Sequence, residues 1–105
     1  MDQEDVFEII LERYHDSVGD VAYTQAGRME GVEIGSEGDI DGDPSLEDIE
    51  ELISIFTDVM GDGSYGIARE AVRSAYEDDK SVSDMDLPER IVPKEVKAEQ
   101  FASAL

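Results

Sequence analysis

Two long segments of this sequence repeat their apolar residues at the spacing of one helix face, which constrains the fold more than any other feature. In residues 6–18 and 46–60, large aliphatic or aromatic side chains recur three or four positions apart. Side chains at this spacing share one face of an α-helix and are buried against other elements. The sequence therefore predicts helices over about residues 3–17 and 46–60. Their apolar faces comprise Val6, Phe7, Ile10, Leu11, Tyr14 and Val18, then Leu46, Ile49, Leu52, Ile53, Phe56 and Met60.

Glycines and small polar residues predict where the other helices begin and end. Gly19 is expected to end the first helix, and a short second helix follows it and ends near Gly27. Ser45 and Asp48 resemble a capping box in front of the second long helix. Ser64 is expected to cap a fourth helix. The apolar positions of this helix are Ile67, Ala68, Ala71, Val72, Ala75 and Tyr76.

After the fourth helix the apolar pattern stops. Residues 80–87 are typical of a polar loop, with Val82, Met85 and Leu87 as possible anchors. Pro88 and Pro93 are expected to hold Glu89–Val92 extended. A last helix is predicted from Lys94 to Leu105.

Residues 31–41 alternate apolar with polar or small side chains and contain several glycines. This pattern predicts a short two-stranded β-hairpin, and a disordered acidic loop is the alternative. We therefore expect a mainly α protein, a small single-core bundle of four to five helices with one short hairpin. Residues 1–87 would form the helical domain. Residues 88–105 would add an extended segment and a helix that pack on the domain or on a partner.

The chain carries a large excess of negative charge. Its 105 residues include 28 Asp and Glu against 8 Lys and Arg, a formal net charge of −20. Raising the salt from about 0.1 M to about 1 M lowers the repulsive cost of folding by about 8 kcal/mol. This compares with a total stability of about 5–15 kcal/mol for an ordinary domain. The composition resembles that of cytosolic proteins from salt-accumulating archaea, so we expect a halophilic cytoplasm and a need for high salt. An ordinary protein with an acidic surface is the alternative.

The composition also excludes several classes of function. Non-specific binding to nucleic acid or to an anionic membrane requires a basic face, which the charge disfavours. The absence of cysteine excludes disulfides, Cys₄ zinc sites and thiol nucleophiles. No apolar run approaches 18 residues, and the acidic start is unlike a signal peptide, so we expect a cytoplasmic protein without a membrane partner.

The charge is unevenly distributed along the chain. Residues 1–60 hold 18 acidic and 2 basic side chains, whereas residues 61–105 hold 10 acidic and 6 basic ones. Residues 88–105 are balanced, with three charges of each sign. A partner would therefore be expected on the second half, where desolvating the surface costs least.

Acidic residues in the segment from Asp39 to Glu50 have the spacing of a calcium-binding EF-hand loop. Asp39, Asp41, Asp43 and Glu50 fall at loop positions 1, 3, 5 and 12 of that motif. Pro44 occupies the sixth position, where the sharp turn requires glycine. We therefore interpret the segment as a solvated acidic turn leading into a helix, and the four acids as weak metal candidates.

Residues 61–66 match the glycine spacing of a dinucleotide-binding loop, but the preceding segment has helical periodicity where that motif requires a strand. We interpret them as a helix end followed by a helix start. The two flanking helices also suggest a DNA-binding helix-turn-helix, but they are long for that motif. Arg69 and Arg73 on the second helix are instead expected to pair with the acidic first half.

The sequence lacks a recognisable catalytic constellation. His15 is the only histidine, with no second histidine or cysteine near it, and is interpreted as a partly exposed helix residue. No serine lies in a nucleophile-elbow sequence, and no carboxylate pair stands out from the acidic background. The sequence therefore predicts a protein that is not an enzyme and carries no cofactor.

These features together predict a protein-interaction or regulatory module. Apolar residues at the chain end, beside a nearly neutral surface, would be poorly covered in a monomer. We expect them to pack across a homodimer or against another protein. The expected partner-binding residues are Phe101, Leu105, Ile91, Val96, Arg69 and Arg73. The alternatives are a small-ligand sensor that binds between helices through tyrosine and arginine side chains, a transcription-associated regulator, and a calcium-binding protein.

Overall fold

The apolar stripes form the helices of a mainly α protein, as the sequence predicts. The computed structural model describes the backbone of residues 2–35 and 37–104 and the side chains of those residues up to Gln100. This part of the chain contains five α-helices, two short strands and two 3₁₀-helices, η1 and η2. In chain order they are α1 (Gln3–Val18), α2 (Val21–Ala26), β1 (Glu33–Ile34), β2 (Ile40–Asp41), α3 (Leu46–Met60), α4 (Gly63–Asp78), η1 (Lys80–Asp84), η2 (Glu89–Ile91) and α5 (Lys94–Ala104).

Both long amphipathic helices begin with a capping box. In α3, the hydroxyl of Ser45 accepts a hydrogen bond from the amide of Asp48, and the Asp48 carboxylate accepts one from the amide of Ser45 at 2.9 Å. Asp2 and Asp5 make the same reciprocal pair at the start of α1. Both helices end at a glycine with φ of +74°, a conformation that side chains rarely adopt.

The core lies between α1, α3 and α4. The ring of Tyr14 on α1 stacks on Phe56 of α3 with 4.0 Å between the ring centroids, and both side chains are fully buried. The Tyr14 hydroxyl donates to the carbonyl oxygen of Ser64 on α4 at 3.0 Å. Burial also raises the pKa of Tyr14, because the phenolate would lose its hydration. These contacts join the three helices at one point.

The prediction that Ser64 caps α4 is wrong. The helix begins at Gly63, two residues before a Ser64 cap would start it, and its N-cap residue Asp62 makes no side-chain cap. Ser64 is buried, and its hydroxyl lies 2.7 Å from that of Thr57 on α3. The α3–α4 turn is short enough to bring the serine against the preceding helix, so its hydroxyl bonds there.

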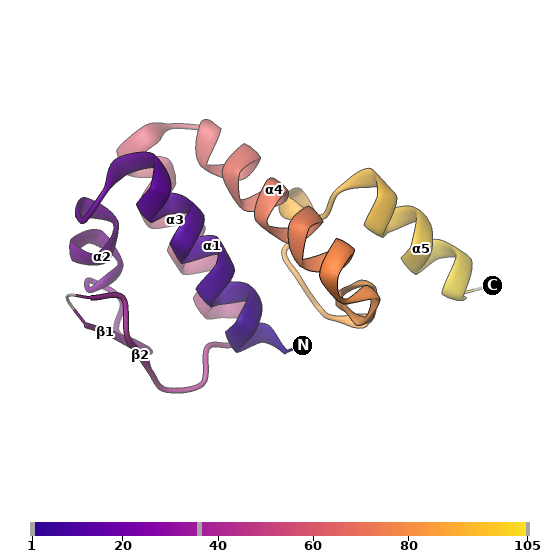
Figure 1. Ribbon diagram of the computed structural model, residues 1–105, viewed down its shortest axis with the longest axis horizontal. Helices are drawn as coiled ribbons and strands as arrows, with labels where there is room; N and C mark the ends of the chain where they lie inside the picture. Colours follow the sequence, from indigo (N-terminus) through magenta and orange to yellow (C-terminus); the bar gives the residue numbers. More distant parts are fainter. Residues whose placement is uncertain (1, 36, 105) are drawn as a thin grey trace.

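The predicted hairpin is present. Ile34 pairs with Ile40, and Glu33 with Asp41, in an antiparallel arrangement. Both isoleucines are half-buried and pack against the core, and Val32 is buried just before β1. The hairpin therefore extends the core at the end of the bundle where α2 lies (Figure 1).

The structure refines one prediction for the segment after α4 and contradicts another. Residues 80–87 contain η1, which the polar composition did not indicate. The expected anchors are confirmed, since Val82 is fully buried and Met85 and Leu87 are half-buried against the core. Residues 89–91 form η2, although the flanking prolines led us to expect an extended chain. The fixed φ of Pro88, −55°, also suits the position just before a helical turn, and its carbonyl accepts from the amide of Ile91 at 3.1 Å.

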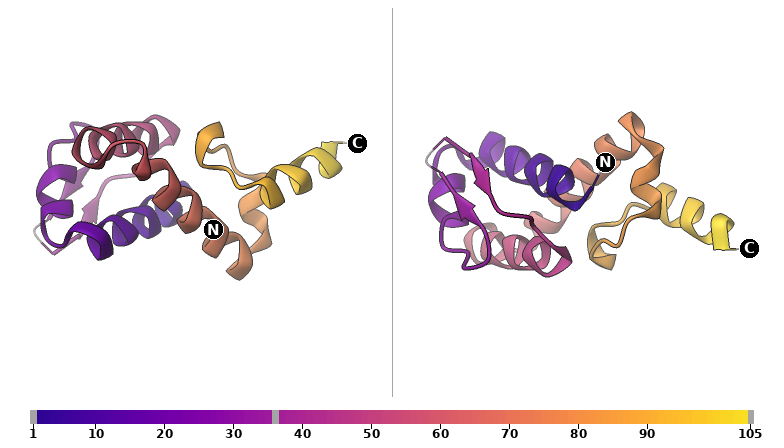
Figure 2. Two further views of the ribbon diagram at one scale, coloured as in Figure 1. Left: turned by 90° about the horizontal axis from the view of Figure 1, so that it is seen from above. Right: turned by 90° about the horizontal axis from the view of Figure 1, so that it is seen from below.

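Helix α4 lies between two groups of elements. One side packs on α1 and α3, and another contacts η1 and η2. Figure 2 shows α5 extending away from the N-terminal helices at the far end of the molecule. The described structure measures 43 × 27 × 21 Å along its principal axes. None of its helices combines the length and the apolar character needed to cross a bilayer.

Candidate partner-binding site

The sequence of α4 gives this helix two different faces. Its buried positions are small or apolar, and they allow α1 to pack closely: Ala68, Ala71, Val72 and Ala75. Arg69 and Arg73 are spaced four residues apart, so they share a different face. Both contact the C-terminal segment, Arg69 through Arg90 and Arg73 through Glu95. The helix thus contributes to the core and to an exposed basic surface.

Most of the chain's positive charge gathers at that surface. A hollow of about 400 Å³ lies between α4, η2 and the start of α5. Five of the eight Lys and Arg residues line it, together with only two carboxylates. We call it the basic hollow, and its lining residues are Arg69, Arg73, Glu89, Arg90, Val92, Lys94, Glu95 and Lys97. In a chain of net charge −20, this concentration makes the local electrostatic potential more positive in the hollow than over the acidic remainder of the surface.

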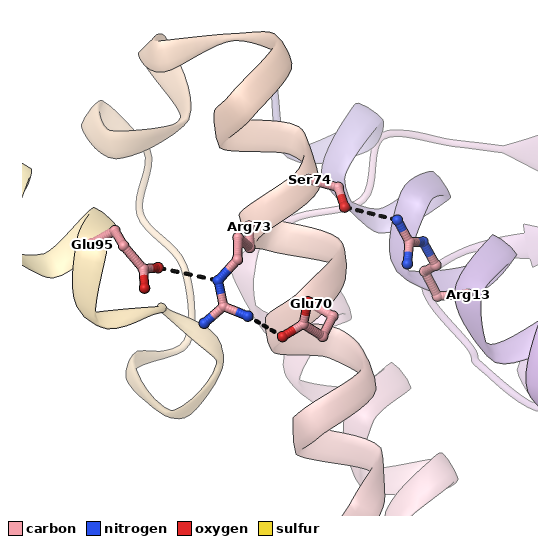
Figure 3. Close-up of polar contacts among 5 residues, drawn as sticks. All are labelled: Arg13, Glu70, Arg73, Ser74 and Glu95. Atoms are coloured by element: carbon pink, nitrogen blue, oxygen red, sulfur yellow. Dashed lines mark hydrogen bonds and ion pairs between the residues drawn. The ribbon is translucent and has the colours of Figure 1, made fainter.

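Arg73 is held in place by two carboxylates (Figure 3). Its Nε donates to Glu95 of α5 at 3.1 Å, and its Nη1 donates to Glu70, one turn earlier on α4. The hydrogen bond that Arg73 donates to Glu95 raises the pKa of Arg73, and the same bond lowers the pKa of the Glu95 carboxyl. The Arg73 side chain is 34% exposed, so salt can screen these pairs and another carboxylate can compete for the guanidinium.

Other contacts position three more of these cations, Arg69, Arg90 and Lys97. The Nη2 of Arg69 donates to the carbonyl oxygen of Arg90 at 2.9 Å, which ties α4 to η2. The Arg90 guanidinium lies 3.7 Å from the centroid of the Tyr65 ring, a cation–π contact. Lys97 lies 3.9 Å from the Glu89 carboxylate. The positive groups are therefore arranged by the fold of the C-terminal segment on α4.

An apolar hollow adjoins the basic one. It has a volume of about 230 Å³ and lies between α3, α4 and η2. Its lining residues are Glu50, Ile53, Tyr65, Pro88, Glu89 and Arg90. Glu89 and Arg90 also line the basic hollow, so the two hollows meet at η2.

The structure places the predicted partner-binding residues in different environments. Arg69 and Arg73 lie in the basic hollow. Ile91 and Val96 are fully buried within the chain, where they anchor η2 and α5, so the expectation that they offer an exposed surface is corrected. The Phe101 side chain and the whole of Leu105 lie outside the described residues.

The expected pairing of the α4 arginines with the acidic first half is wrong. Arg73 pairs with Glu70 and Glu95, both in the second half. Arg13, from the first half, instead bridges the two halves, since its Nη2 donates to Ser74 of α4 at 2.7 Å (Figure 3). Opposite charges were available nearer to the α4 arginines, because the C-terminal segment folds back on that helix.

Several residues of the site were not identified from the sequence. Arg90, Lys94 and Lys97 are the three positive charges of the balanced segment 88–105, and nothing in the sequence distinguishes Tyr65 from the other tyrosines. The neutral balance of residues 88–105 was the available signal, but it does not show that this segment lies beside Arg69 and Arg73. That proximity depends on the course of the chain through η1 and η2.

The weak calcium candidates are not assembled into a site. Asp41 belongs to β2, and Asp43 lies exposed in the turn that follows. Glu50 lines the apolar hollow, whereas Asp39 lines a separate hollow with Glu8 and other acids. Across residues 2–35 and 37–104, no three acidic or histidine side chains are placed together to hold a metal ion.

The only histidine lies away from the basic hollow. His15 stacks on Tyr23 with 4.4 Å between the ring centroids, and its Nε2 lies 2.9 Å from the Asp20 carboxylate. The histidine side chain is 33% exposed and that of Asp20 is 93% exposed. The contact joins the end of α1 to the start of α2 across the Gly19 turn, which is a structural use of the ring.

Comparisons of this chain with models of known families, with curated proteins and with solved structures find no match. The function is therefore argued from the basic and apolar hollows and from the charge around them.

Proposed function

We propose that this protein is a non-enzymatic protein-interaction module that binds its partner through the basic hollow. One observation carries the proposal: five of eight cationic side chains line one hollow in a chain with 28 acidic residues. Elsewhere an acidic surface repels negatively charged partners, so it favours approach to this one face. The partner is a second protein or a second copy of the chain.

The surrounding charge favours a protein partner over nucleic acid. Duplex DNA carries a negative charge about every 1.7 Å of its axis, so it extends well beyond a hollow of this size. Outside the hollow it would meet the acidic remainder of the chain. A protein can present a few carboxylates locally and place neutral or basic residues opposite the acidic surface.

We also propose that the protein works in a halophilic cytoplasm. The net charge of −20 on 105 residues favours a medium in which concentrated ions screen repulsion. Under those conditions exposed ion pairs weaken while apolar contacts strengthen, so a partner needs both kinds of contact. The adjoining apolar hollow offers the second kind.

Site-specific crosslinking in the cells that make the protein tests the proposed interaction. A photo-reactive amino acid would replace Lys94 in the basic hollow and, as the matched control, Glu12 on the acidic face of α1. We expect discrete protein adducts from position 94 and none from position 12. Adducts of the chain with itself would identify the partner as a second copy. Equal adducts from both positions, or none from position 94, would contradict the proposal.

A small-ligand sensor is the second candidate function. The apolar hollow brings Tyr65 and Arg90 together between helices, and such side chains are suited to binding a small apolar or anionic molecule. Native mass spectrometry of the purified protein would show a co-purified ligand as a defined added mass. Loss of that mass in Tyr65→Ala, with the fold retained, would favour the sensor over the interaction module.

A further inference from the structure

We infer that the two adjoining hollows form one composite site for an acidic peptide segment that carries an apolar side chain. This inference rests on the proposed function and names the chemistry of the partner. The hollows share Glu89 and Arg90, so one ligand can occupy both. Charge complementarity with the basic hollow and the apolar character of its neighbour identify the two parts of that ligand.

The apolar hollow has the size and walls of a side-chain pocket. Its volume of about 230 Å³ is below the roughly 300–1,000 Å³ typical of small-molecule sites. Ile53 and Pro88 supply aliphatic surface, and the Tyr65 ring is held beneath the Arg90 guanidinium. A leucine or phenylalanine side chain of a partner would be desolvated here.

The basic hollow would receive carboxylates next to that side chain. Guanidinium groups bind carboxylates through two parallel hydrogen bonds, and Arg69, Arg73 and Arg90 all line this hollow. In the free protein, Arg73 forms ion pairs with Glu70 and Glu95, and both pairs are accessible to solvent. A carboxylate from the partner would replace Glu95, so binding exchanges one ion pair for another.

A short acidic peptide fits this site better than a long polyanion does. An extended peptide advances about 3.3 Å per residue, so two or three carboxylates around one apolar residue span only the two hollows. The remaining partner residues would not have to be acidic. A single-stranded oligonucleotide carries charge along its whole length and would also meet Glu50 and the other acids of α3.

Fluorescence anisotropy with defined peptides tests the inference on the intact chain in high KCl. The probe is a labelled peptide in which one phenylalanine is flanked on both sides by aspartates. The comparison peptides replace the phenylalanine with serine, or the aspartates with asparagines. A labelled oligo-dT of similar length represents nucleic acid. We expect the first peptide to bind, and each replacement to weaken its binding by about five- to tenfold.

Charge variants of the protein complete the test. Arg73→Gln and Lys94→Gln should each lower the affinity about three- to tenfold, since each removes a charge from the basic hollow. Arg28→Gln is the matched control, because it makes the same charge change at an exposed residue near the hairpin. Circular dichroism would show that all three variants remain helical. Equal effects of the three substitutions would overturn the inference.

Other results would also overturn it, and they bear differently on the proposed function. If the peptides bind equally with and without the phenylalanine, the apolar hollow takes no part in binding and the composite site is wrong. Tighter binding of oligo-dT would assign the hollow to nucleic acid and would contradict the proposed function as well. If no peptide binds while position 94 still crosslinks to a protein, the acidic-peptide inference fails and the interaction function stands.

Discussion

The N-terminal helices and the C-terminal segment of this chain are held in place by different forces. In residues 2–60, large buried side chains stack between helices, and capping boxes start α1 and α3. Residues 80–100 have a few buried anchors and several exposed contacts to α4: Val82, Ile91, Val92 and Val96, with the Arg69 and Arg73 hydrogen bonds.

The difference in packing explains why acidic side chains concentrate in the N-terminal helices and basic ones near the C-terminal segment. Residues 1–60 hold 18 of the 28 acidic side chains, and the apolar core there can offset their repulsion. The C-terminal segment has less apolar packing and uses opposite charges to dock on α4. Salt should therefore act on the two regions in opposite directions, because it screens repulsion in the first and attraction in the second.

The largest expected effect is that of salt on overall stability. Raising KCl from about 0.1 M to about 1 M should increase the free energy of unfolding by about 8 kcal/mol, because ions screen the excess carboxylates. Urea unfolding at each salt concentration measures it, since urea adds no ions. In a variant with Glu4, Glu8 and Glu12 changed to Gln, the free energy of unfolding should increase less with salt. Equal stability in dilute buffer and in brine would contradict both the repulsion argument and the proposed halophilic setting.

Truncating one buried side chain in each region should show whether the N-terminal helices and the C-terminal segment unfold independently. Phe56→Ala should lower the free energy of unfolding by about 3–5 kcal/mol, since it removes the stack with Tyr14 and leaves a cavity. Val96→Ala removes only two methyl groups and should cost about 2 kcal/mol. Hydrogen exchange should show the Phe56 effect throughout the bundle and the Val96 effect mainly in α5. Global loss of protection in Val96→Ala would show that the two regions unfold as one unit.

A smaller effect is expected where α1 meets α4. Tyr14→Phe keeps the stacked ring but removes the hydroxyl that donates to Ser64, and should cost about 1 kcal/mol. Tyr76→Phe is a suitable control, because that tyrosine is only half-buried and its ring lies under Lys80. Chemical denaturation of both variants measures the difference. Equal changes would mean that the buried hydrogen bond adds nothing to the junction.

The smallest expected effect concerns pH and the docking of α5. Arg73 lowers the pKa of Glu95 below its usual 4.5, so the pair stabilises the fold above that pH and ceases to do so as pH falls through the lowered pKa. Glu95→Gln should therefore weaken protection of α5 at neutral pH and make no difference at about pH 2, well into the acid range. Hydrogen exchange of the α5 amides, corrected for intrinsic rates, measures this. Glu99→Gln, on the same helix, should lack this pH dependence.

Local sequence signals were enough to predict the helices and the hairpin. Apolar residues at helical spacing, together with Ser45 and Asp48, specified α3, because burial and capping there involve residues only a few positions apart. The alternation around Val32 and Ile34 specified β1 in the same way. Prolines were a weaker signal, since the φ of Pro88 is compatible with both an extended chain and the start of η2.

The candidate site could not be predicted in the same way. Arg73 and Glu95 are 22 positions apart, and their contact requires η1 and η2 to return the chain to α4. The burial of Val96 likewise depends on how α5 docks, and the pattern of α5 alone does not reveal it. Arg69 and Arg73 were predicted to be partner-binding residues, which stays a prediction, but their neighbours in the fold are set by tertiary structure.

The two capping boxes limit how this protein could be re-engineered for use in dilute buffer. The obvious strategy is to exchange surface carboxylates for neutral amides until the net charge is moderate. Asp2, Asp5 and Asp48 should be spared, because their oxygens satisfy backbone amides at the first turns of α1 and α3. An exposed acid such as Glu47 could be replaced more safely, although even there the start of a helix favours a negative group.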